Sequence, residues 1–205
     1  MSKEDITINP EELRPNFKIS SSAQEPVYTT SASSASQPEY TADVTNLNYA
    51  SQGLLYTLTT PAAIIQTSNF MALNMSNPTT SGKTAYLMQC SAYNSGKPNS
   101  ASNYTRIDIY RNASVTTTGA IAATAQNTNL GSSTTSSCTA YYVALSSNAV
   151  SGTASATRVE SIGNPVIFDF NGGYVVPAGK SFTIQAYNNT NGTNVISLNL
   201  SWLEK

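Results

Sequence analysis

Residues 196–202, Ile-Ser-Leu-Asn-Leu-Ser-Trp, alternate apolar and polar side chains without exception. Successive side chains of a β-strand point to opposite faces, so this period of two places four apolar residues on one buried face. No window of the chain combines a sustained helical period with capping residues. The pattern therefore predicts that the chain folds into β-strands, each with one face toward a hydrophobic core.

The polar composition favours the same structure. Ser (29), Thr (26) and Asn (21) make up 76 of the 205 residues, whereas charged residues make up 10%, against about 25% in ordinary globular domains. Thr suits strands, while Ser and Asn favour turns because their side chains compete with helical hydrogen bonds. With a net charge of −1, copies of the chain repel one another little, which a polymerising subunit tolerates. The same surface also suits an ordinary secreted or virion β-domain.

Eight segments carry strand-like patterns and are separated by turn residues. They span residues 54–60, 69–75, 84–90, 105–111, 138–145, 165–170, 181–187 and 196–202. Asn191-Gly192 predicts a type I′ hairpin between the last two, because that turn needs positive φ at both central positions. Residues 171–173 and 177–180 mark two further turns. About 8–10 strands at this spacing predict an all-β, jelly-roll β-sandwich, with an immunoglobulin-like sandwich as second choice.

Residues 113–137 are rich in Ser, Thr, Ala, Asn and Gly and are weakly patterned. They predict either a long exposed loop or two irregular edge strands. Long loops on a rigid sandwich often carry binding. This segment, together with Tyr141 and Tyr142, therefore keeps a glycan- or receptor-binding interpretation open.

Charge divides the chain into two parts. Residues 1–43 hold seven acidic and three basic residues (net −4), and residues 44–205 hold four acidic and seven basic residues (net +3), which sum to −1. Residues 28–38 are low in complexity and similar to a linker. We therefore predict an extended N-terminal arm and linker over residues 1–45 and a single jelly-roll domain over residues 46–205.

The arm contains two short alternating segments, with Ile6 and Ile8 in one and Phe17 and Ile19 in the other. Leu13 lies between them, in a stretch bounded by prolines that has room for one helical turn. Such short strand-like segments need a partner strand. Either they belong to a disordered tail, or they add to a sheet of a neighbouring copy. The second interpretation makes Ile6, Ile8, Leu13, Phe17 and Ile19 the predicted subunit interface.

Cys90 and Cys138 are too few to frame a fold. Each lies in a strand-like segment, and free cysteines are commonly small buried side chains. A disulfide within or between subunits is the alternative. Two cysteines without a histidine cannot complete a zinc site, so we predict no metal.

The chain has no histidine, which removes the commonest general base near neutral pH and any Ser-His-Asp mechanism. No nucleotide- or phosphate-binding motif is present. The carboxylates of residues 44–205 are expected to be isolated surface acids, and the two in mid-strand should point to solvent. These residues are Asp108, Glu160, Asp169 and Glu204, with Asp108 and Asp169 in mid-strand. We predict no catalytic residue, no cofactor and no enzymatic activity.

Lys and Arg total ten and are scattered singly, which is not the basic field that nucleic acid requires. No apolar run approaches the ~20 residues of a transmembrane helix. Residues 1–8 lack the apolar core of a signal peptide. We therefore expect neither nucleic acid nor a membrane as partner, and no recognisable signal for secretion.

Residues 176–182, Val-Pro-Ala-Gly-Lys-Ser-Phe, and the strand at 196–202 resemble the small jelly-roll subunits of bacterial endospore appendages and of virions. The resemblance is one of strand and turn pattern, and it extends over residues 46–205. In the appendage families an N-terminal extension completes the sheet of the next subunit. Families with paired N-terminal cysteines are not matched, because residues 1–43 contain none.

That resemblance implies a structural subunit that assembles with copies of itself into an extracellular filament or appendage, at a spore or cell surface. The arm would add as a strand to a neighbouring subunit. The alternative is a phage tail-tip or capsid-decoration protein, or a carbohydrate-binding module, with the virion or a glycan as its setting.

Overall fold

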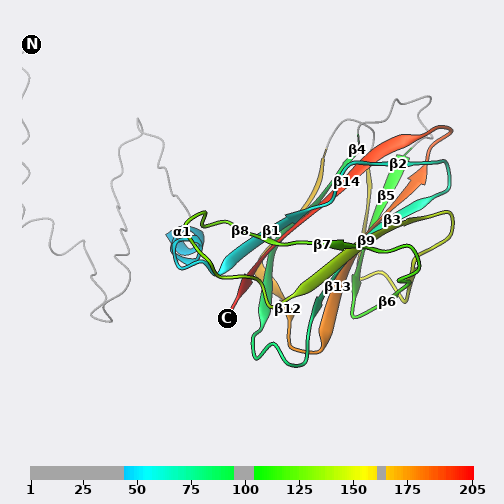
Figure 1. The fold of residues 1–205 in the computed structure, drawn as a ribbon. Helices are drawn as coiled ribbons and strands as arrows, with labels where there is room; N and C mark the ends of the chain where they lie inside the picture. Colours follow the sequence, from blue (N-terminus) through cyan, green and yellow to red (C-terminus); the bar gives the residue numbers. More distant parts are fainter. Residues whose placement is uncertain (1–43, 95–103, 161–164) are drawn as a thin grey trace, which may run out of the picture. The chain divides into compact units, whose positions relative to one another are not determined.

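A computed structural model describes residues 44–94, 104–160 and 165–205, and most of these residues lie in strands (Figure 1). The chain divides into two units, residues 1–47 and residues 48–205. The five arm residues predicted as a subunit interface lie outside the described residues. The described strands form two antiparallel six-stranded sheets and a two-stranded one. The all-β prediction is confirmed.

The first sheet has the C-terminal strand near its centre. Its strands follow the order β12, β4, β14, β1 and β8, and β2 also pairs with β14. Their bounds are β1 Leu55–Thr59, β2 Ala63–Ile65, β4 Ala85–Asn94, β8 Gln126–Asn127, β12 Val166–Val176 and β14 Asn194–Glu204.

The second sheet follows the order β11, β5, β13, β3, β9 and β7. Their bounds are β3 Phe70–Asn77, β5 Tyr104–Arg111, β7 Ile121–Ala123, β9 Thr139–Leu145, β11 Ala156–Glu160 and β13 Lys180–Asn189. Each of the eight predicted segments coincides with one of the longer strands. The five-residue strand β11 was not predicted, because its sequence has no apolar alternation.

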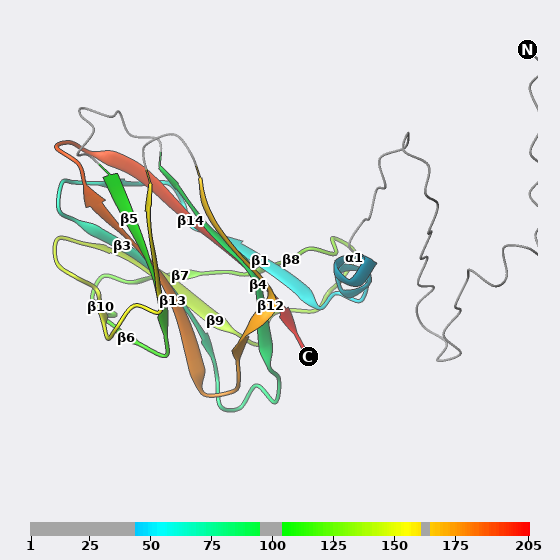
Figure 2. The same ribbon diagram turned by 180° about the vertical axis from the view of Figure 1, so that it is seen from behind.

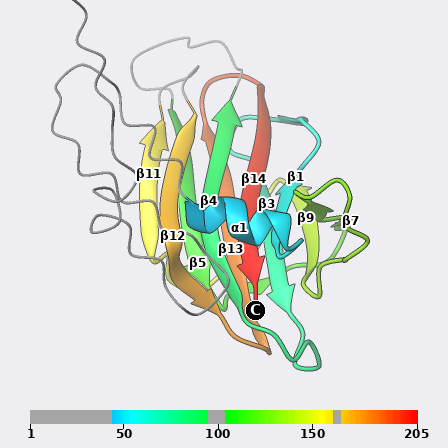
Figure 3. The ribbon, with the colours of Figure 1, turned by 90° about the vertical axis from the view of Figure 1, so that its left-hand side faces the viewer.

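The two sheets form a β-sandwich with one main apolar core between them (Figure 3). The alternation of residues 196–202 is confirmed, because the four apolar side chains of this segment are at most 2% exposed. The second sheet contributes Phe182 and Ile184, each at most 1% exposed. Burying a side chain of this size stabilises the fold by about 1.5–3 kcal/mol. Trp202 packs beside Tyr56, with ring centroids 6.0 Å apart.

A smaller apolar cluster covers the outer face of the second sheet. Strands β6, Ser114–Val115, and β10, Val150–Ser151, pair with each other and lie side by side in Figure 2. The buried members of this cluster are Ala72, Tyr110, Val143, Ala149 and Val150. This face of the sandwich is therefore less accessible than strand alternation alone suggests.

The prediction that Asp108 points to solvent is wrong. Asp108 is 3% exposed, because Arg106 and Thr157 lie against it. The Arg106 Nε–H and the Thr157 hydroxyl donate hydrogen bonds to its carboxylate, at 2.8 and 2.7 Å. The prediction for Asp169 is confirmed: it is exposed and accepts one hydrogen bond, from Gln89 Nε2 at 2.7 Å.

The hairpin predicted at Asn191-Gly192 is also wrong. Neither residue has positive φ, and the strands on either side, β13 and β14, belong to different sheets. The buried side chain of Asn188 controls this connection by donating to the carbonyls of Ile65 (2.8 Å) and Gly192 (2.9 Å). Asn194 Nδ2 donates to Asn188 Oδ1 at 2.7 Å. These side-chain bonds turn the chain from one sheet to the other, so local turn propensity does not decide its conformation.

One short helix, α1, spans Val44–Ser51 and was not predicted. Its sequence has no acidic residue in the first turn and no basic residue in the last, so charge marks neither of its ends. Contacts distant in sequence stabilise its last residues: the Asn129 amide donates to the Ser51 carbonyl (2.8 Å), and Lys205 contacts Tyr49. Among the described residues no helix is long and apolar enough to cross a membrane.

Candidate functional site

On one side of the sandwich a single segment joins both sheets. Within residues 121–127, β7 pairs with β9 of the second sheet and β8 pairs with β1 of the first (Figure 1). Of the two expectations for residues 113–137, the structure therefore supports irregular edge strands. We call this side, formed by residues 121–138 with β1 and β9, the closed side.

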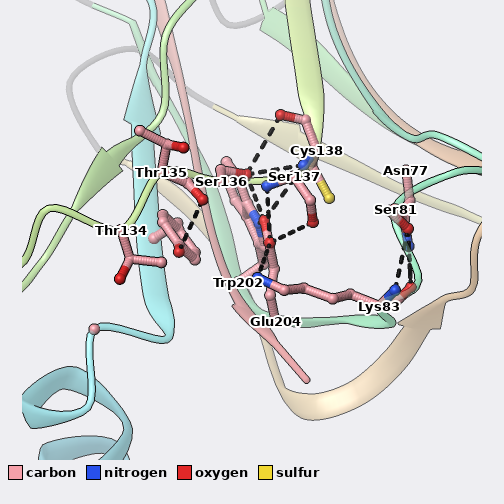
Figure 4. A network of polar contacts seen from close by, with 12 residues as sticks. Asn77, Ser81, Lys83, Thr134, Thr135, Ser136, Ser137, Cys138, Trp202 and Glu204 are labelled. Carbon is pink, nitrogen blue, oxygen red and sulfur yellow. Dashed lines mark hydrogen bonds and ion pairs between the residues drawn. The ribbon is translucent and has the colours of Figure 1, made fainter.

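A buried carboxylate holds the end of this segment to the C-terminal strand (Figure 4). Glu204 is fully buried and accepts hydrogen bonds from Trp202 Nε1 (2.9 Å), from the Ser137 backbone N–H (2.9 Å) and from the Ser137 hydroxyl (2.6 Å). The Ser136 hydroxyl donates a further bond. Because Ser136 and Ser137 are separated from the start of β9 only by Cys138, the network links β14 of the first sheet to the start of β9 in the second.

Glu204 was expected to be an isolated surface acid, and that expectation is wrong. Burial alone would raise the pKa of its carboxyl, but the hydrogen bonds from Ser136, Ser137 and Trp202 outweigh burial and lower the pKa to about 2. Lys83 adds an ion pair, with Nζ 3.6 Å from the carboxylate. The carboxyl is therefore held ionised at neutral pH, as an acceptor that ties chain segments together. A lone Glu next to the C-terminal Lys gave no sequence signal of this role.

Both cysteines are free thiols. Cys90 is 1% exposed within the main core, and Cys138 is partly buried beside the Glu204 network. Burial raises the pKa of each thiol to about 12, and the nearby Glu204 carboxylate adds to the rise at Cys138. Of the two interpretations, the structure favours buried thiols over a disulfide between Cys90 and Cys138.

The opposite side of the sandwich ends in two strand edges. β11 is the last strand of the second sheet and β12 the last of the first, and Figure 3 shows them next to each other. Among the described residues β11 pairs only with β5, and β12 only with β4. We call this side, formed by β11 and β12, the open side.

Two exposed side chains make contacts across the open side, Arg158 and Ser155, and the Ser155 hydroxyl lies 2.9 Å from the Tyr174 hydroxyl. The Arg158 guanidinium donates a hydrogen bond to the Ile167 carbonyl (2.5 Å) and lies 4.6 Å from the centroid of the Phe168 ring. The Ile167 carbonyl is therefore directed away from β4, toward the free edge. No β-ladder joins β11 to β12 in the described residues.

The two strands of the open side also expose aliphatic side chains. Val159 is 60% exposed, Val175 47% and Ile167 39%. These are three of the seven large apolar side chains that are exposed in the described residues, and the closed side exposes Ile121 and Leu130. A free strand edge with exposed aliphatic residues is a surface to which another strand can add, and proteins usually protect such edges.

An irregularity in β12 shortens its free edge. The pairing with β4 shifts between Asp169 and Tyr174, and Asn171 and Gly172 between them have positive φ, 48° and 78°. The turn predicted at residues 171–173 is thus a bulge within one strand. It divides the edge into two pieces, residues 166–169 and 174–176, which suit short added strands better than one long strand.

A pocket of about 310 Å³ lies beside the second piece of this edge. β11 pairs with β5 only from Thr105 to Ile109, so β5 continues to Arg111 without it. The pocket lies there, lined by Arg111 together with Tyr174 and Phe182. It therefore belongs to the open side.

Tyr141 and Tyr142 do not form a free aromatic platform. The Tyr141 hydroxyl donates to the Val115 carbonyl at 3.4 Å, and Tyr142 packs against the main core. Both side chains are half-buried. These contacts give the two rings a structural role on the second sheet.

Scans against protein-family models, curated proteins and solved structures find no match to this chain. In residues 44–94, 104–160 and 165–205, no group of three or more cysteine, aspartate and glutamate side chains could hold a metal ion. The open side is the candidate functional site on its own geometry, because it combines free edges, exposed aliphatic residues and a pocket.

Proposed function

We propose that the sandwich is a jelly roll. Four antiparallel pairs support this, because they are nested about the chain reversal between β5 and β11. The pairs are β5 with β11, β4 with β12, β3 with β13, and β1 with β14. Two four-stranded sheets with this pairing are what an eight-stranded jelly roll requires. β7, β8 and β9 are then additions within the long excursion from β5 to β11.

On this fold the chain is a structural subunit that assembles with copies of itself into a filament or appendage, outside the cell or on a spore surface. The arm, residues 1–45, adds as a strand to the open side of a neighbouring copy. The observation that carries the proposal is the free edge of β12, with Ile167 and Val175 exposed along it.

Two physical arguments favour this assembly. The arm of one copy on the open side of the next is a head-to-tail contact, and head-to-tail contacts that do not close into a ring generate filaments. The charges are also complementary, because residues 1–43 carry a net −4 and residues 44–205 a net +3. Opposite charge on the two surfaces increases the rate at which they meet.

Negative-stain microscopy of the purified full chain tests the proposal, with fibres as the expected result. Replacing Ile6 and Ile8 together with Asp should abolish them, since each docked aliphatic side chain contributes about 1.5–3 kcal/mol of burial. Replacing Ile167 and Val175 with Asp should also abolish fibres, because these two residues lie on the edge that would receive the arm.

Control variants add negative charge away from the proposed contact. Thr7→Asp with Asn9→Asp alters the other face of the same arm segment and should leave more assembly than the Ile6 and Ile8 variant. Ile64→Asp alters an exposed aliphatic residue of the first sheet outside the open side, where Ile64 is 69% exposed. A full chain that stays monomeric at high concentration would contradict the proposal.

A further inference from the structure

We propose that the pocket beside residues 174–176 receives the arm segment Glu11-Glu12-Leu13 of a neighbouring copy, with Leu13 inside and the two carboxylates at its rim. This inference rests on the proposed function and names the contact that would set where the arm docks. The shape and the charge of the pocket support this inference, and so do the sequence and the length of the arm.

The pocket has room for an aliphatic side chain, and its interior is apolar. Its volume of about 310 Å³ is at the lower limit of small-molecule pockets, which span about 300–1,000 Å³. Val176, Pro177 and Phe182 give it an apolar lining. The Arg111 guanidinium lies 5.1 Å from the centroid of the Tyr174 ring, so it obstructs one face of that ring for a stacked sugar. The lining therefore favours a compact apolar side chain.

Two cations mark the lining of this pocket. Arg111 and Lys180 both line it, both are exposed, and no acidic residue lines it with them. Among the described residues, neither forms an ion pair; the described ion pairs join Lys83 to Glu204 and Arg106 to Asp108. A partner that fits this pocket should therefore place carboxylates next to an apolar group.

The arm contains such a pattern twice. Glu4-Asp5-Ile6 and Glu11-Glu12-Leu13 each place two acidic residues directly before a branched aliphatic residue. Within residues 44–205 no two acidic residues are adjacent. The first run overlaps Ile6 and Ile8, which the proposed function assigns to strand addition, so the second run is left for the pocket.

The reach of the arm fits both contacts. On the first sheet, β4 residues Cys90 and Tyr86 pair with β12 residues Phe168 and Val175. These four steps along β4 span about 13 Å at about 3.3 Å per residue. The five steps from Ile8 to Leu13 can extend to about 17 Å. An arm that pairs beside Phe168 can thus pass the bulge of β12 and place Leu13 in the pocket.

A charge exchange in the full chain tests the inference. Arg111→Glu with Lys180→Glu should abolish fibres, and so should Glu11→Lys with Glu12→Lys. All four substitutions in one chain should restore them, because the attraction is re-created with reversed sign. Glu4→Lys with Asp5→Lys in the Arg111, Lys180 variant should not restore them. Circular dichroism and thermal melts should show an unchanged fold, since both altered cations are exposed.

A binding measurement separates the pocket from the proposed function. A synthetic peptide of residues 1–20 is titrated by calorimetry into the full chain carrying Ile6→Asp, Ile8→Asp and Leu13→Ser, where both proposed contacts of the chain's own arm are disabled. Adding Arg111→Glu with Lys180→Glu should weaken peptide binding at least tenfold, and so should replacing Leu13 of the peptide with Ser. The control Arg158→Glu changes a cation of the open side outside the pocket and should weaken binding less.

Each outcome has a separate meaning. If peptide binding and fibres both survive Arg111→Glu with Lys180→Glu, the assignment of the pocket is wrong, while the proposed strand addition is unaffected. Absence of both fibres and peptide binding in every variant overturns the proposed function and the pocket together. Retention on a glycan array that is lost in the Arg111, Lys180 variant overturns the peptide assignment in favour of carbohydrate binding.

Discussion

On the closed side a buried carboxylate and a crossing segment join the two sheets, whereas on the open side the two strand edges are linked only by contacts of the exposed side chains Arg158 and Ser155 among the described residues. Glu204 is fully buried and surrounded by donors from Ser136, Ser137 and Trp202. Arg158 makes its contacts in solvent. In the described part of the chain, the sandwich thus completes one side with its own segments and leaves the edges of β11 and β12 unpaired on the other. The difference indicates which side contributes more to stability, and it supports the docking role proposed for the other.

The largest expected effect is on the closed side. Glu204→Ala in the full chain should lower the free energy of unfolding by about 3–5 kcal/mol, because it leaves Lys83, the buried Trp202 Nε1 and the half-buried Ser136 and Ser137 without their acceptor. Urea denaturation, at concentrations where the chain is monomeric, measures the loss. The control Asp169→Ala removes an exposed carboxylate with one hydrogen bond and should cost less than about 1 kcal/mol. Equal losses would contradict the distinction between the two sides.

Acid should weaken the closed side selectively. The pKa of Glu204 is lowered from 4.5 to about 2 in the folded protein, so its ionised form stabilises the fold fully above pH 4.5. That contribution is lost as pH falls through 4.5 toward 2. Stability curves of the full chain and of Glu204→Gln should therefore converge as pH falls over this range. A difference between them that stays constant from pH 6 to pH 2 would show that the charge of Glu204 contributes nothing.

The smallest effect is expected on the open side. Arg158→Ala removes one hydrogen bond and one contact with the Phe168 ring, both at an exposed side chain, and should lower the free energy of unfolding by less than about 1 kcal/mol. The same urea titration measures it. A loss of 3 kcal/mol or more would mean that the open side is a locked part of the fold, which would argue against a docking role.

Strand patterns predicted much of this fold because burial in a sandwich follows local alternation. The segment at residues 196–202 is the clearest case, and Phe182 and Ile184 are another. The predictions failed where distant side chains decide the structure. Asn188 directs the turn that Asn191-Gly192 was expected to form, and Ser136 and Ser137 bury a glutamate that looks solvent-exposed in the sequence.

Of the contact proposed here, only the arm residues were predictable from the sequence. Ile6 and Ile8 stand out by alternation, but the receiving edge depends on strand order, which no local pattern contains. β11 has a sequence of weak strand character, and β12 is divided by a bulge whose sequence is typical of a turn at the end of a strand. Arg111 and Lys180 are 69 positions apart in the sequence and line one pocket only because β5 and β13 are neighbours in the second sheet.

The two thiols bear on how reversible the proposed assembly would be. A thiol reacts as its thiolate, and burial raises the pKa of Cys90 and Cys138 to about 12. At pH 8 only about one molecule in 10⁴ then carries the reactive form of either thiol. Copies would be held together without covalent links, so fibres should dissolve in hot detergent without a reducing agent. Such a polymer can be taken apart and rebuilt from the same subunits.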